Sequence, residues 1–425
     1  FEIMLSESQE RMIVVVKKGK EEEIKKIFDK WGLDSAVIGR VTNDGKFRVR
    51  DKGEIVADIP AKSLAEGAPV YRRKGKKPDI LDSVNQLDLS WISQPDDYNQ
   101  VLLQLMGSPN IISKEKIYEH YDYMVRNNTI LHPGDDAAVL RIKGTKKAIA
   151  LTTDGNGRYC YLDPLMGGKI AVAEAARNLS CKGALPRAVT DCLNFGNPEK
   201  EAIYWQLEEA IKGISEACRV LQTPVISGNV SLYNESKGEA IYPTPVIGMV
   251  GIIEDYNHIC SMEFKNYNDL IVLLGENKEE LGGSEYLKII HNLEKGIPPR
   301  IDLLKEQTVQ TVCREAIKKE LVSSAHDCSE GGLAIALVES CIKGGKGAKI
   351  KIKDKVRSDA LLFGESQSRI IISLNPKNLS SLQEIADKYQ VPLLVLGSVE
   401  GEELNINRLI SIKVEQLEKV WKGTK

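Results

Sequence analysis

The sequence predicts an α+β fold with mixed sheets, in which part of one structural unit occurs twice. The string ESQER at residues 7–11 returns 358 positions later as ESQSR at residues 365–369, and each copy leads into an apolar run. Strand-like and helix-like segments alternate along most of the chain, with connections of irregular length. Because this repeat is far longer than the period of a solenoid, it indicates a duplicated domain.

The two copies have unequal surroundings. The second copy is preceded by roughly 280 residues of its own unit, counted from about position 82, whereas the first has six residues before it. Phe1 stands where an initiator Met would be expected. We therefore expect the chain to be the back portion of a longer protein, with its first unit truncated. We also expect residues 7–41 and 365–399 to fold alike, as strand, helix and strand.

Composition excludes several classes of protein. The 58 basic and 60 acidic side chains nearly balance, so bulk charge favours neither nucleic acid nor an anionic membrane. No apolar run approaches the roughly 18 residues that a membrane-spanning helix needs. The eight cysteines include no CxxC pair, which indicates reduced thiols rather than a zinc or disulfide framework. We expect a cytoplasmic protein with no nucleic-acid or membrane partner.

The first elements belong to the truncated unit. Residues 12–16 have the composition of a strand, and 21–31 show the i, i+3, i+4, i+7 apolar spacing of an amphipathic helix. Further strands are predicted at 36–41 and 47–49. The stretch 63–93 contains two prolines and a basic cluster, so it is predicted to be a linker. Residues 1–62 would then be the remnant of a first C-terminal domain.

The remaining chain is predicted to form two domains, at residues 94–258 and 259–425. In the first, strand-like runs are separated by two helical stretches; the strands are expected at 148–153, 187–190, 223–226 and 246–253, and the helices at 168–182 and 201–221. The second domain begins with a strand at 269–274, has a helix near 332–342, and ends with the second copy of the repeat.

Polar clusters follow several of these strands, where ligands bind in many α/β proteins. They contain Asp154, the segments 191–198 and 227–231 and, further upstream, Gly134-Asp135-Asp136. Asp and Asn oxygens suit Mg²⁺, and glycines let backbone N–H groups approach phosphate. The alternative is that each cluster is an ordinary turn. Four clusters in one domain favour a phosphate and metal site.

Other familiar sites are absent from the sequence. Neither a GxxxxGK[ST] loop nor a GxGxxG turn after a strand occurs, so a nucleotide would not be held as in those folds. Among five histidines only His326, beside Asp327, has a suggestive setting, and we assign it a hydrogen-bonded structural role with catalysis as the alternative. Cys192 lies in a polar segment but has no nearby histidine to activate it as a nucleophile.

Several strings resemble a known superfamily. GDDAAV at 134–139, a strand ending in Thr-Thr-Asp154, HDCSEGGL at 326–333 and the two ESQ strings resemble the ATP-binding superfamily of aminoimidazole ribonucleotide (AIR) synthetase, selenophosphate synthetase and thiamine-monophosphate kinase. Longer strings are similar to one of its members, phosphoribosylformylglycinamidine synthase: MLSESQERM at 4–12, TDCLNFGNPEK at 190–200, SGNVSLYNE at 227–235, YPTPVIGMVG at 242–251 and LGGSEYL at 281–287.

The resemblance implies a fold and a reaction. The fold would be a duplicated pair of AIR-synthetase-like N-terminal ATP-binding and C-terminal domains, with the first copy truncated. The reaction would be the purine-pathway condensation of formylglycinamide ribonucleotide with ammonia from glutamine, in which ATP activates the formamide oxygen. ATP and Mg²⁺ are the implied cofactors. A separate glutaminase subunit and a small bridging subunit are the implied partners, because no glutaminase domain is recognisable here.

The resemblance also implies roles for particular residues. Asp191 and Gly228 would contact ATP, Asn229 would bind Mg²⁺ and Ser231 would touch the substrate. Glu7, Ser8 and Gln9 would belong to the substrate site of the first half. Further candidates for phosphate or metal binding are Asp135, Asp136, Asp154 and Asp327. The family's catalytic histidines would lie in the missing head, and none of the five histidines here stands in the matching motif.

Two other functions remain open from the sequence. The chain could be a nucleotide-binding structural half without catalysis, because one of two pseudo-equivalent sites in long family members holds a structural nucleotide. It could also be an enzyme like AIR synthetase, which pairs two identical half-length chains. Two ESQ strings in one chain argue against the second possibility.

Overall fold

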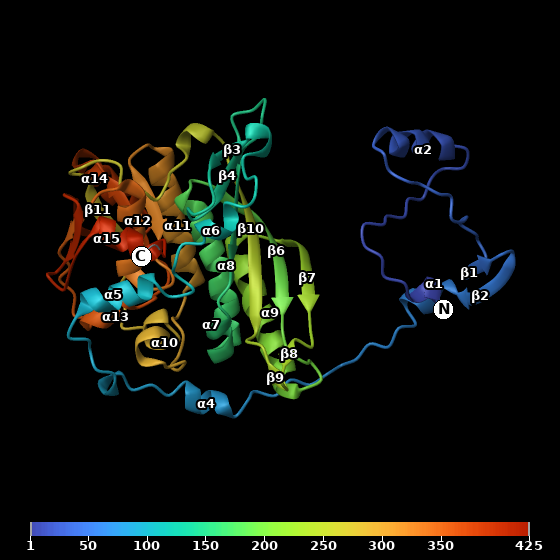
Figure 1. The fold of residues 1–425 in the computed structure, drawn as a ribbon, viewed down its shortest axis with the longest axis horizontal. Coiled ribbons are helices and arrows are strands. Elements are labelled where there is room, and N and C mark those ends of the chain that lie inside the picture. Colours follow the sequence, from blue (N-terminus) through green and yellow to red (C-terminus); the bar gives the residue numbers. More distant parts are fainter. Residues whose placement is uncertain (1, 424–425) are drawn as a thin grey trace. The chain divides into compact units, whose positions relative to one another are not determined.

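The computed structural model describes residues 2–423. They form two compact units that divide between Arg72 and Arg73 (Figure 1). Unit 1 contains three helices, α1 (Glu2–Leu5), α2 (Glu21–Lys30) and α3 (Ala61–Ala65), and the hairpin of β1 (Lys46–Asp51) and β2 (Glu54–Pro60). Across residues 2–423, no helix is both long and apolar enough to span a bilayer.

The hairpin of unit 1 follows from its turn. Lys52 and Gly53 connect the two strands, and both have positive φ, at 49° and 92°. Such a two-residue turn matches the right-handed twist of paired strands, and glycine tolerates the conformation without strain. The predicted strand at 47–49 is therefore confirmed, and it is longer than expected.

The predicted strands at 12–16 and 36–41 are wrong. Neither segment forms a helix or a paired strand, and most of their apolar side chains are exposed, Met12 by 91% and Val41 by 82%. Their counterparts in the second copy, β14 (Ile370–Leu374) and β15 (Leu393–Val399), pair with the two sides of β11 (Leu270–Leu274). Within residues 2–423 the first-copy segments pair with no strand, and a lone strand cannot satisfy its backbone groups.

The helix between these segments occurs in both copies and begins and ends at equivalent residues. α2 spans Glu21–Lys30 and α14 spans Leu379–Lys388, and both bounds differ by 358. The prediction of a common strand, helix and strand is thus confirmed for the helix alone. An amphipathic helix forms locally, through contacts within its own turns, whereas a strand needs a neighbour.

The ESQ turn is duplicated in its hydrogen bonds. In the first copy, Arg11 donates from Nε to the carbonyl of Ser8 at 3.1 Å and from Nη2 to the carbonyl of Ser6 at 3.3 Å. In the second copy, Arg369 donates from Nε to the carbonyl of Ser366 at 2.8 Å and from Nη2 to the carbonyl of Gly364 at 2.7 Å, the positions equivalent to Ser8 and Ser6. The residue before each arginine has φ close to 60°. The repeat therefore specifies one backbone turn closed by one guanidinium.

Unit 2 contains two large sheets. The six-stranded sheet has the order β3-β4-β5-β10-β6-β7, with β6 and β7 parallel and every other pair antiparallel. Its strands are β3 (Thr129–Leu131), β4 (Ala138–Arg141), β5 (Ala148–Asp154), β6 (Leu185–Asn194), β7 (Val225–Ser231) and β10 (Thr244–Ile253). A small hairpin, β8 (Glu235–Ser236) and β9 (Glu239–Ala240), follows β7.

Two long helices cover one face of this sheet. α8 (Pro164–Cys181) and α9 (Glu201–Leu221) pack against the alternate residues of β6 and β10 that are buried, and the opposite face is left open (Figure 1). α8 begins where Asp163 accepts the N–H of Met166, with Pro164 at its first position. The two helices approach closely because a Cβ on Gly168 would lie 2.4 Å from the carbonyl oxygen of Ala210.

The seven-stranded sheet has the order β12-β14-β11-β15-β13-β16-β17. Its other strands are β12 (Ser324–Asp327), β13 (Ala348–Ile350), β16 (Glu403–Ile406) and β17 (Ile410–Lys413). The remaining helices of unit 2 are α4 (Ile80–Val84), α5 (Tyr98–Met106), α6 (Glu115–Tyr118), α7 (Gly157–Leu162), α10 (Glu285–His291), α11 (Leu303–Lys318), α12 (Gly332–Gly344), α13 (Ser358–Phe363) and α15 (Val414–Trp421). Four 3₁₀ turns complete it: η1 (Leu89–Trp91), η2 (Val125–Asn127), η3 (Tyr256–His258) and η4 (Pro376–Asn378).

α8 also contacts α11 and β12, so it lies between the six-stranded sheet and elements of the seven-stranded one. Seven of the eight cysteines are buried in these cores, as expected of reduced thiols. The helix and strand positions predicted between residues 148 and 342 are confirmed within a few residues. The polar segments 191–194 and 227–231, however, lie inside β6 and β7 rather than after them, because paired strands continue through polar residues.

The boundary between the two units, after Arg72, falls in the predicted linker, which also contains α4 and η1. The domain division at 63–93 and at 258 stays a prediction.

We expect Arg369→Ala to destabilise unit 2 by about 2–4 kcal/mol, because it leaves two buried carbonyl groups without donors. Arg369 is 1% exposed. The matched control is Arg11→Ala, which removes the same hydrogen bonds at an exposed position and should change stability by less than about 0.5 kcal/mol. Urea unfolding followed by tryptophan fluorescence measures both; equal losses would contradict the expectation.

Candidate functional site

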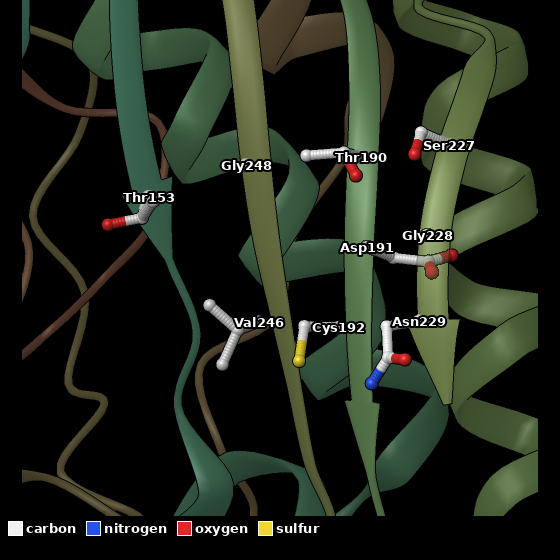
Figure 2. Close-up of a pocket in the computed structure, with 9 residues that line it drawn as sticks. All are labelled: Thr153, Thr190, Asp191, Cys192, Ser227, Gly228, Asn229, Val246 and Gly248. Carbon is white, nitrogen blue, oxygen red and sulfur yellow. The ribbon is translucent and has the colours of Figure 1, made fainter. Parts of the chain in front are cut away.

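A pocket of about 360 Å³ lies on the six-stranded sheet, across β5, β10, β6 and β7 (Figure 2). Its lining residues are mostly small and polar: Thr153, Thr190, Asp191, Cys192, Ser227, Gly228, Asn229, Val246 and Gly248. Most of them project from the open face, because register pairs Thr190 with Gly248 and Ser227, and Cys192 with Val246 and Asn229.

Asp191 and Gly228 are paired directly across β6 and β7, and Asn229 follows Gly228. From the spacing of paired strands and the rise per residue, the Cα atoms of Asp191 and Asn229 lie about 6 Å apart. Side chains alternate between the two faces along a strand, so those of Asp191 and Asn229 point toward opposite faces of the sheet. The two side chains therefore need not bind the same ligand atom. The three residues are thus neighbours on paired strands. That they converge on one phosphate and Mg²⁺ site stays a prediction.

Gly228 is required by the position of the Asp191 carboxylate. A Cβ built on Gly228 would lie 2.1 Å from Asp191 Oδ1, far inside contact distance. Figure 2 shows the Asp191 side chain extending toward Gly228. Burial raises the pKa of the Asp191 carboxyl above its usual value. The glycine thus gives the carboxylate room at the edge of the pocket, and its backbone stays open to an approaching phosphate.

The donor set fits a hydrated Mg²⁺ with phosphate. Mg²⁺ takes oxygen ligands, keeps several waters and is usually bound through one or two protein groups plus phosphate oxygens. Asn229 offers a carboxamide oxygen at the pocket, and Ser227 and Thr190 offer hydroxyl groups beside it. Softer ligands are limited to Cys192, a half-buried thiol that receives a weak hydrogen bond from Asn194 at 3.6 Å.

Ser231 lies two residues beyond Asn229 on β7, on the same face of the sheet. Its hydroxyl donates to the side-chain oxygen of Asn234 at 3.2 Å. The structure therefore places this predicted substrate residue at the end of the strand that carries Gly228 and Asn229.

The two ESQ strings are placed in different environments. Glu7, Ser8 and Gln9 belong to unit 1 and are exposed. In unit 2, the Glu365 carboxylate accepts the backbone N–H groups of Gly331 and Glu285 at 2.8 and 2.9 Å, and it accepts the hydroxyl of Tyr159. Burial, with Glu285 and Glu330 nearby, raises the pKa of Glu365 to about 8. The second copy is thus engaged inside unit 2.

A second polar group lies on the other side of the sheet, along α8. Asp154 accepts hydrogen bonds from the Asn178 amide at 3.1 and 3.2 Å, and one from the Thr152 hydroxyl at 3.3 Å. Asp327 accepts from Nε of Arg177 at 3.2 Å, and another nitrogen of this guanidinium donates to Glu306 at 2.9 Å. Asn178 Oδ1 is buried without a partner. This group is separate from the pocket on the open face.

The carboxylates of this group resist ionisation. Burial, reinforced by Asp327 and Glu330, raises the pKa of Asp154 to about 8. Burial also raises the pKa of Asp327 to about 6, with Arg177 opposing it. Neighbouring like charges in a dry site are unfavourable, so a proton is retained on at least one member near neutral pH.

Asp135 and Asp136 belong to neither the pocket nor the Asp154 group. Both pair with Lys182, and Asp136 also pairs with His326 at 2.5 Å. Burial opposes ionisation of Asp136, yet His326 and Lys182 outweigh it and lower its pKa to about 2. Asp135 and Asp136 have partners next to α8, whereas Asp154 and Asp191 both pair with Ile247 of β10 and so lie on the same face of the sheet. That Asp154 and Asp135 or Asp136 share a cleft with Asp191 stays a prediction. His326 is hydrogen-bonded at both nitrogens, as a structural role requires.

Sequence reasoning missed the polar stripe of α8. Glu174, Arg177 and Asn178 lie three and four residues apart in a mostly apolar, alanine-rich helix, and Lys182, directly after the helix, follows Asn178 by four residues. That spacing puts them on one face of the helix. A polar stripe on a helix flanked by apolar residues is the signal that could have found them.

We expect the stability of unit 2 to decrease as pH rises from about 4 to 8, in part through Asp154. Its folded-state pKa, about 8, lies above the ordinary 3.8, so the folded state holds a proton that the unfolded chain releases. Asp154→Asn removes this contribution and should stabilise the protein at pH 8 by on the order of 1–3 kcal/mol, with little effect near pH 4. Urea unfolding at several pH values measures the difference.

The control is Asp255→Asn. The N–H of Asn257 lowers the pKa of Asp255, so this substitution should not stabilise the protein at pH 8. A wild-type stability that rises steadily between pH 5 and 8, with no gain in Asp154→Asn, would contradict the expectation.

Comparison with family models gives two matches. The N-terminal domain model of AIR synthase related proteins matches residues 134–253, which contain the six-stranded sheet from Gly134 onward. The C-terminal domain model of the same proteins matches residues 1–52 and 267–407. Two separate segments thus match one model, in agreement with the repeat.

Relatives match along the whole chain. The phosphoribosylformylglycinamidine synthase subunit PurL of Caldanaerobacter subterraneus subsp. tengcongensis is 57% identical over 427 residues, which cover 100% of this chain and 58% of the relative. The corresponding protein of Moorella thermoacetica is 52% identical and covers 99% of this chain and 58% of its own length. The chain therefore spans about 58% of the length of these relatives.

Solved structures share the fold. T. maritima PurL complexed with ATP aligns with a TM-score of 0.59 at 17% identity, covering 77% of this chain and 53% of that one. The structure of PurLQS from Thermotoga maritima gives a TM-score of 0.60 at 18% identity, covering 80% of this chain and 54% of that one. At this level of identity the likeness extends to the architecture alone.

Proposed function

Because the chain belongs to the AIR synthase-related protein family, we propose that it supplies the second half of a phosphoribosylformylglycinamidine synthase. Such an enzyme condenses formylglycinamide ribonucleotide with ammonia and uses ATP to activate the formamide oxygen. The proposal is supported by 57% identity to a PurL subunit across the full chain. Since the chain spans 58% of that relative, the complete reaction would also need the part that this chain does not match.

The observation that carries the proposal is the arrangement of Asp191, Gly228 and Asn229 on paired strands at one pocket. Gly228 would let the triphosphate approach the backbone of β7, and Asp191 would contact the nucleotide at the strand edge. Asn229 would hold Mg²⁺, and Ser231, further along β7, would contact the substrate. Mg²⁺, when bound, would neutralise charge on the phosphate oxygens.

The chain's own residues would then position rather than transform the reactants. β7 is paired to β6 over its length, so it presents Gly228, Asn229 and Ser231 in a fixed order along one edge. Fixed donors at the place where charge develops stabilise a transition state without reorganising. The exposed Glu7, Ser8 and Gln9 would contribute to substrate binding in the first half.

The partners of the complete enzyme follow from the same proposal. Ammonia would come from a separate glutaminase subunit, joined through a small bridging subunit, and formylglycinamide ribonucleotide would be the acceptor. A PurLQS assembly from Thermotoga maritima has the same fold in its aligned part, which supports a multi-subunit organisation.

A structural role for unit 2 is the second candidate function. It is favoured by the burial of the second ESQ string and by the internal ion pairs of Asp135 and Asp136. Under this alternative the pocket at Asn229 would hold a nucleotide that stabilises the fold but does not react. Substitutions at the pocket would then lower stability and leave turnover of the remaining folded enzyme unchanged.

A chimera separates the two candidates. In it, this chain replaces the matching 58% of the Caldanaerobacter protein. We expect the chimera to make formylglycinamidine ribonucleotide from ammonia, and we expect Asp191→Ala and Asn229→Ala to lower kcat/KM by roughly 10²- to 10³-fold, as loss of transition-state contacts does. Circular dichroism should show an unchanged fold.

The control is Asp79→Ala, an exposed aspartate of unit 2, which should leave turnover within about twofold of the unsubstituted chimera. Full turnover in Asp191→Ala and Asn229→Ala, together with a lowered melting temperature, would favour the structural role.

We expect the 425-residue chain by itself to bind ATP·Mg²⁺ weakly and to make no formylglycinamidine ribonucleotide. The resemblance places the catalytic histidines in the part of the relatives that this chain does not match. Catalytic residues act as a unit, so an enzyme that lacks several of them loses most of its rate enhancement. An assay with ammonia as nitrogen donor, using protein from a host strain that lacks its own synthase, measures this. Turnover above background would contradict it.

A further inference from the structure

We propose that the ammonium group of Lys182 is the built-in counter-ion of the Asp135–Asp136 pair, in the place that a divalent cation would otherwise take. The pair would then be a metal-independent clamp within unit 2. This inference does not depend on the proposed synthase activity, because it concerns residues outside the pocket at Asn229.

The ammonium is enclosed by oxygen atoms. Lys182 immediately follows α8, and its side chain is 0% exposed. Its Nζ hydrogen-bonds Asp135 Oδ1, lies 3.0 Å from Asp136 Oδ2 and donates to the carbonyl of Ala325 at 3.4 Å. A buried lysine stays charged only where anions compensate for lost hydration. Burial opposes its charge, but Asp135 and Asp136 raise the pKa of Lys182 well above the usual value.

The other oxygens of the pair also face protein donors. Asp135 Oδ2 accepts the backbone N–H of Met262 at 3.2 Å. Asp136 Oδ1 contacts His326 Nδ1 at 2.5 Å, and the second nitrogen of that ring lies 3.0 Å from Glu339. The two aspartates are therefore balanced by one ammonium and one imidazolium. Three of the four carboxylate oxygens accept a hydrogen bond from the protein, and the fourth, Asp136 Oδ2, makes no hydrogen bond but lies 3.0 Å from the Lys182 ammonium.

A divalent cation cannot share this position with the ammonium. Mg²⁺ binds oxygen at about 2.1 Å, so at this position it would occupy the space in which the ammonium nitrogen already contacts Asp135 and lies 3.0 Å from Asp136 Oδ2. Both cations together would be within about 4 Å of each other among buried side chains, where like charges repel strongly. The two aspartates of the GDD string would suit a metal ion, but in the folded chain the ammonium group of Lys182 pairs with both of them.

The clamp joins elements around both sheets of unit 2. Asp135 and Asp136 lie between β3 and β4 of the six-stranded sheet, and Lys182 follows the helix that covers this sheet. Ala325 and His326 belong to β12, the edge strand of the seven-stranded sheet. The ion pairs therefore connect the six-stranded sheet and its helix to the seven-stranded sheet without a bound ligand.

The test uses the full 425-residue chain, Mn²⁺ as the probe, and electron paramagnetic resonance to count bound ions. We expect the wild type and Asp136→Asn to bind the same number of Mn²⁺ ions per chain. We expect Lys182→Ala to bind one more, because the substitution leaves two adjacent carboxylates and space for an ion. In the double variant Lys182→Ala/Asp136→Asn, the additional site should be lost.

Thermal unfolding gives a second readout. Without metal, Lys182→Ala should melt at least about 5 °C lower than the wild type, since a buried ion pair has lost one partner. Added Mn²⁺ should restore part of this loss in Lys182→Ala but not in the double variant. The matched control is Lys169→Ala on the same helix, which breaks a more exposed pair with Glu216 and should neither gain an ion nor respond to Mn²⁺.

Two results would overturn the proposal. One is a wild-type Mn²⁺ site that Asp136→Asn or His326→Ala removes, which would show that Asp136, His326 and Asp327 hold a metal despite Lys182. The other is a folded Lys182→Ala that gains no ion. If Lys182→Ala does not fold, Lys182→Met, which keeps the aliphatic stem, takes its place, and the comparison of wild type with Asp136→Asn decides independently.

Discussion

The packing of unit 2 depends on helix α8 and its buried charges. The helix covers the six-stranded sheet with its apolar side and also contacts α11 and β12. From its polar stripe, Arg177 pairs with Asp327 and Glu306, both buried. Charges taken out of water are tolerated only when their partners are in place, so one mutual arrangement of the two sheets satisfies them and displaced arrangements do not.

This constraint divides the polar residues of the six-stranded sheet by face. On the helix-covered side, Asp154 is bound to Asn178 and lies near Asp327. On the open side, the pocket residues Thr190, Ser227 and Asn229 are neutral and accessible. The face with more carboxylates is therefore not the face better suited to a diffusible ligand. Buried groups that are already paired within the protein are not free to bind a ligand, whereas the accessible neutral groups of the open face are.

Much of the fold could be predicted from the sequence, because local patterns determine it. The helix at 201–221 was predicted to the residue, and the strand at 246–253 to within two residues. The strands at 12–16 and 36–41 were predicted from the same kind of pattern and failed, because strands depend on neighbours that composition does not reveal. The ion pair of Asp135 could not be predicted for a related reason. The cation that pairs with Asp135 is Lys182, which lies 47 residues further along the sequence.

The two ESQ strings show how far a motif determines chemistry. In both copies an arginine closes the same turn, so the string specifies the backbone. In unit 2, the carboxylate of Glu365 accepts three hydrogen bonds from Tyr159, Glu285 and Gly331, and it is buried. In unit 1, Glu7 is exposed. Because the same side chain is saturated in one place and free in the other, the surroundings rather than the motif decide which copy can receive a ligand. The turn is the part that both copies must keep.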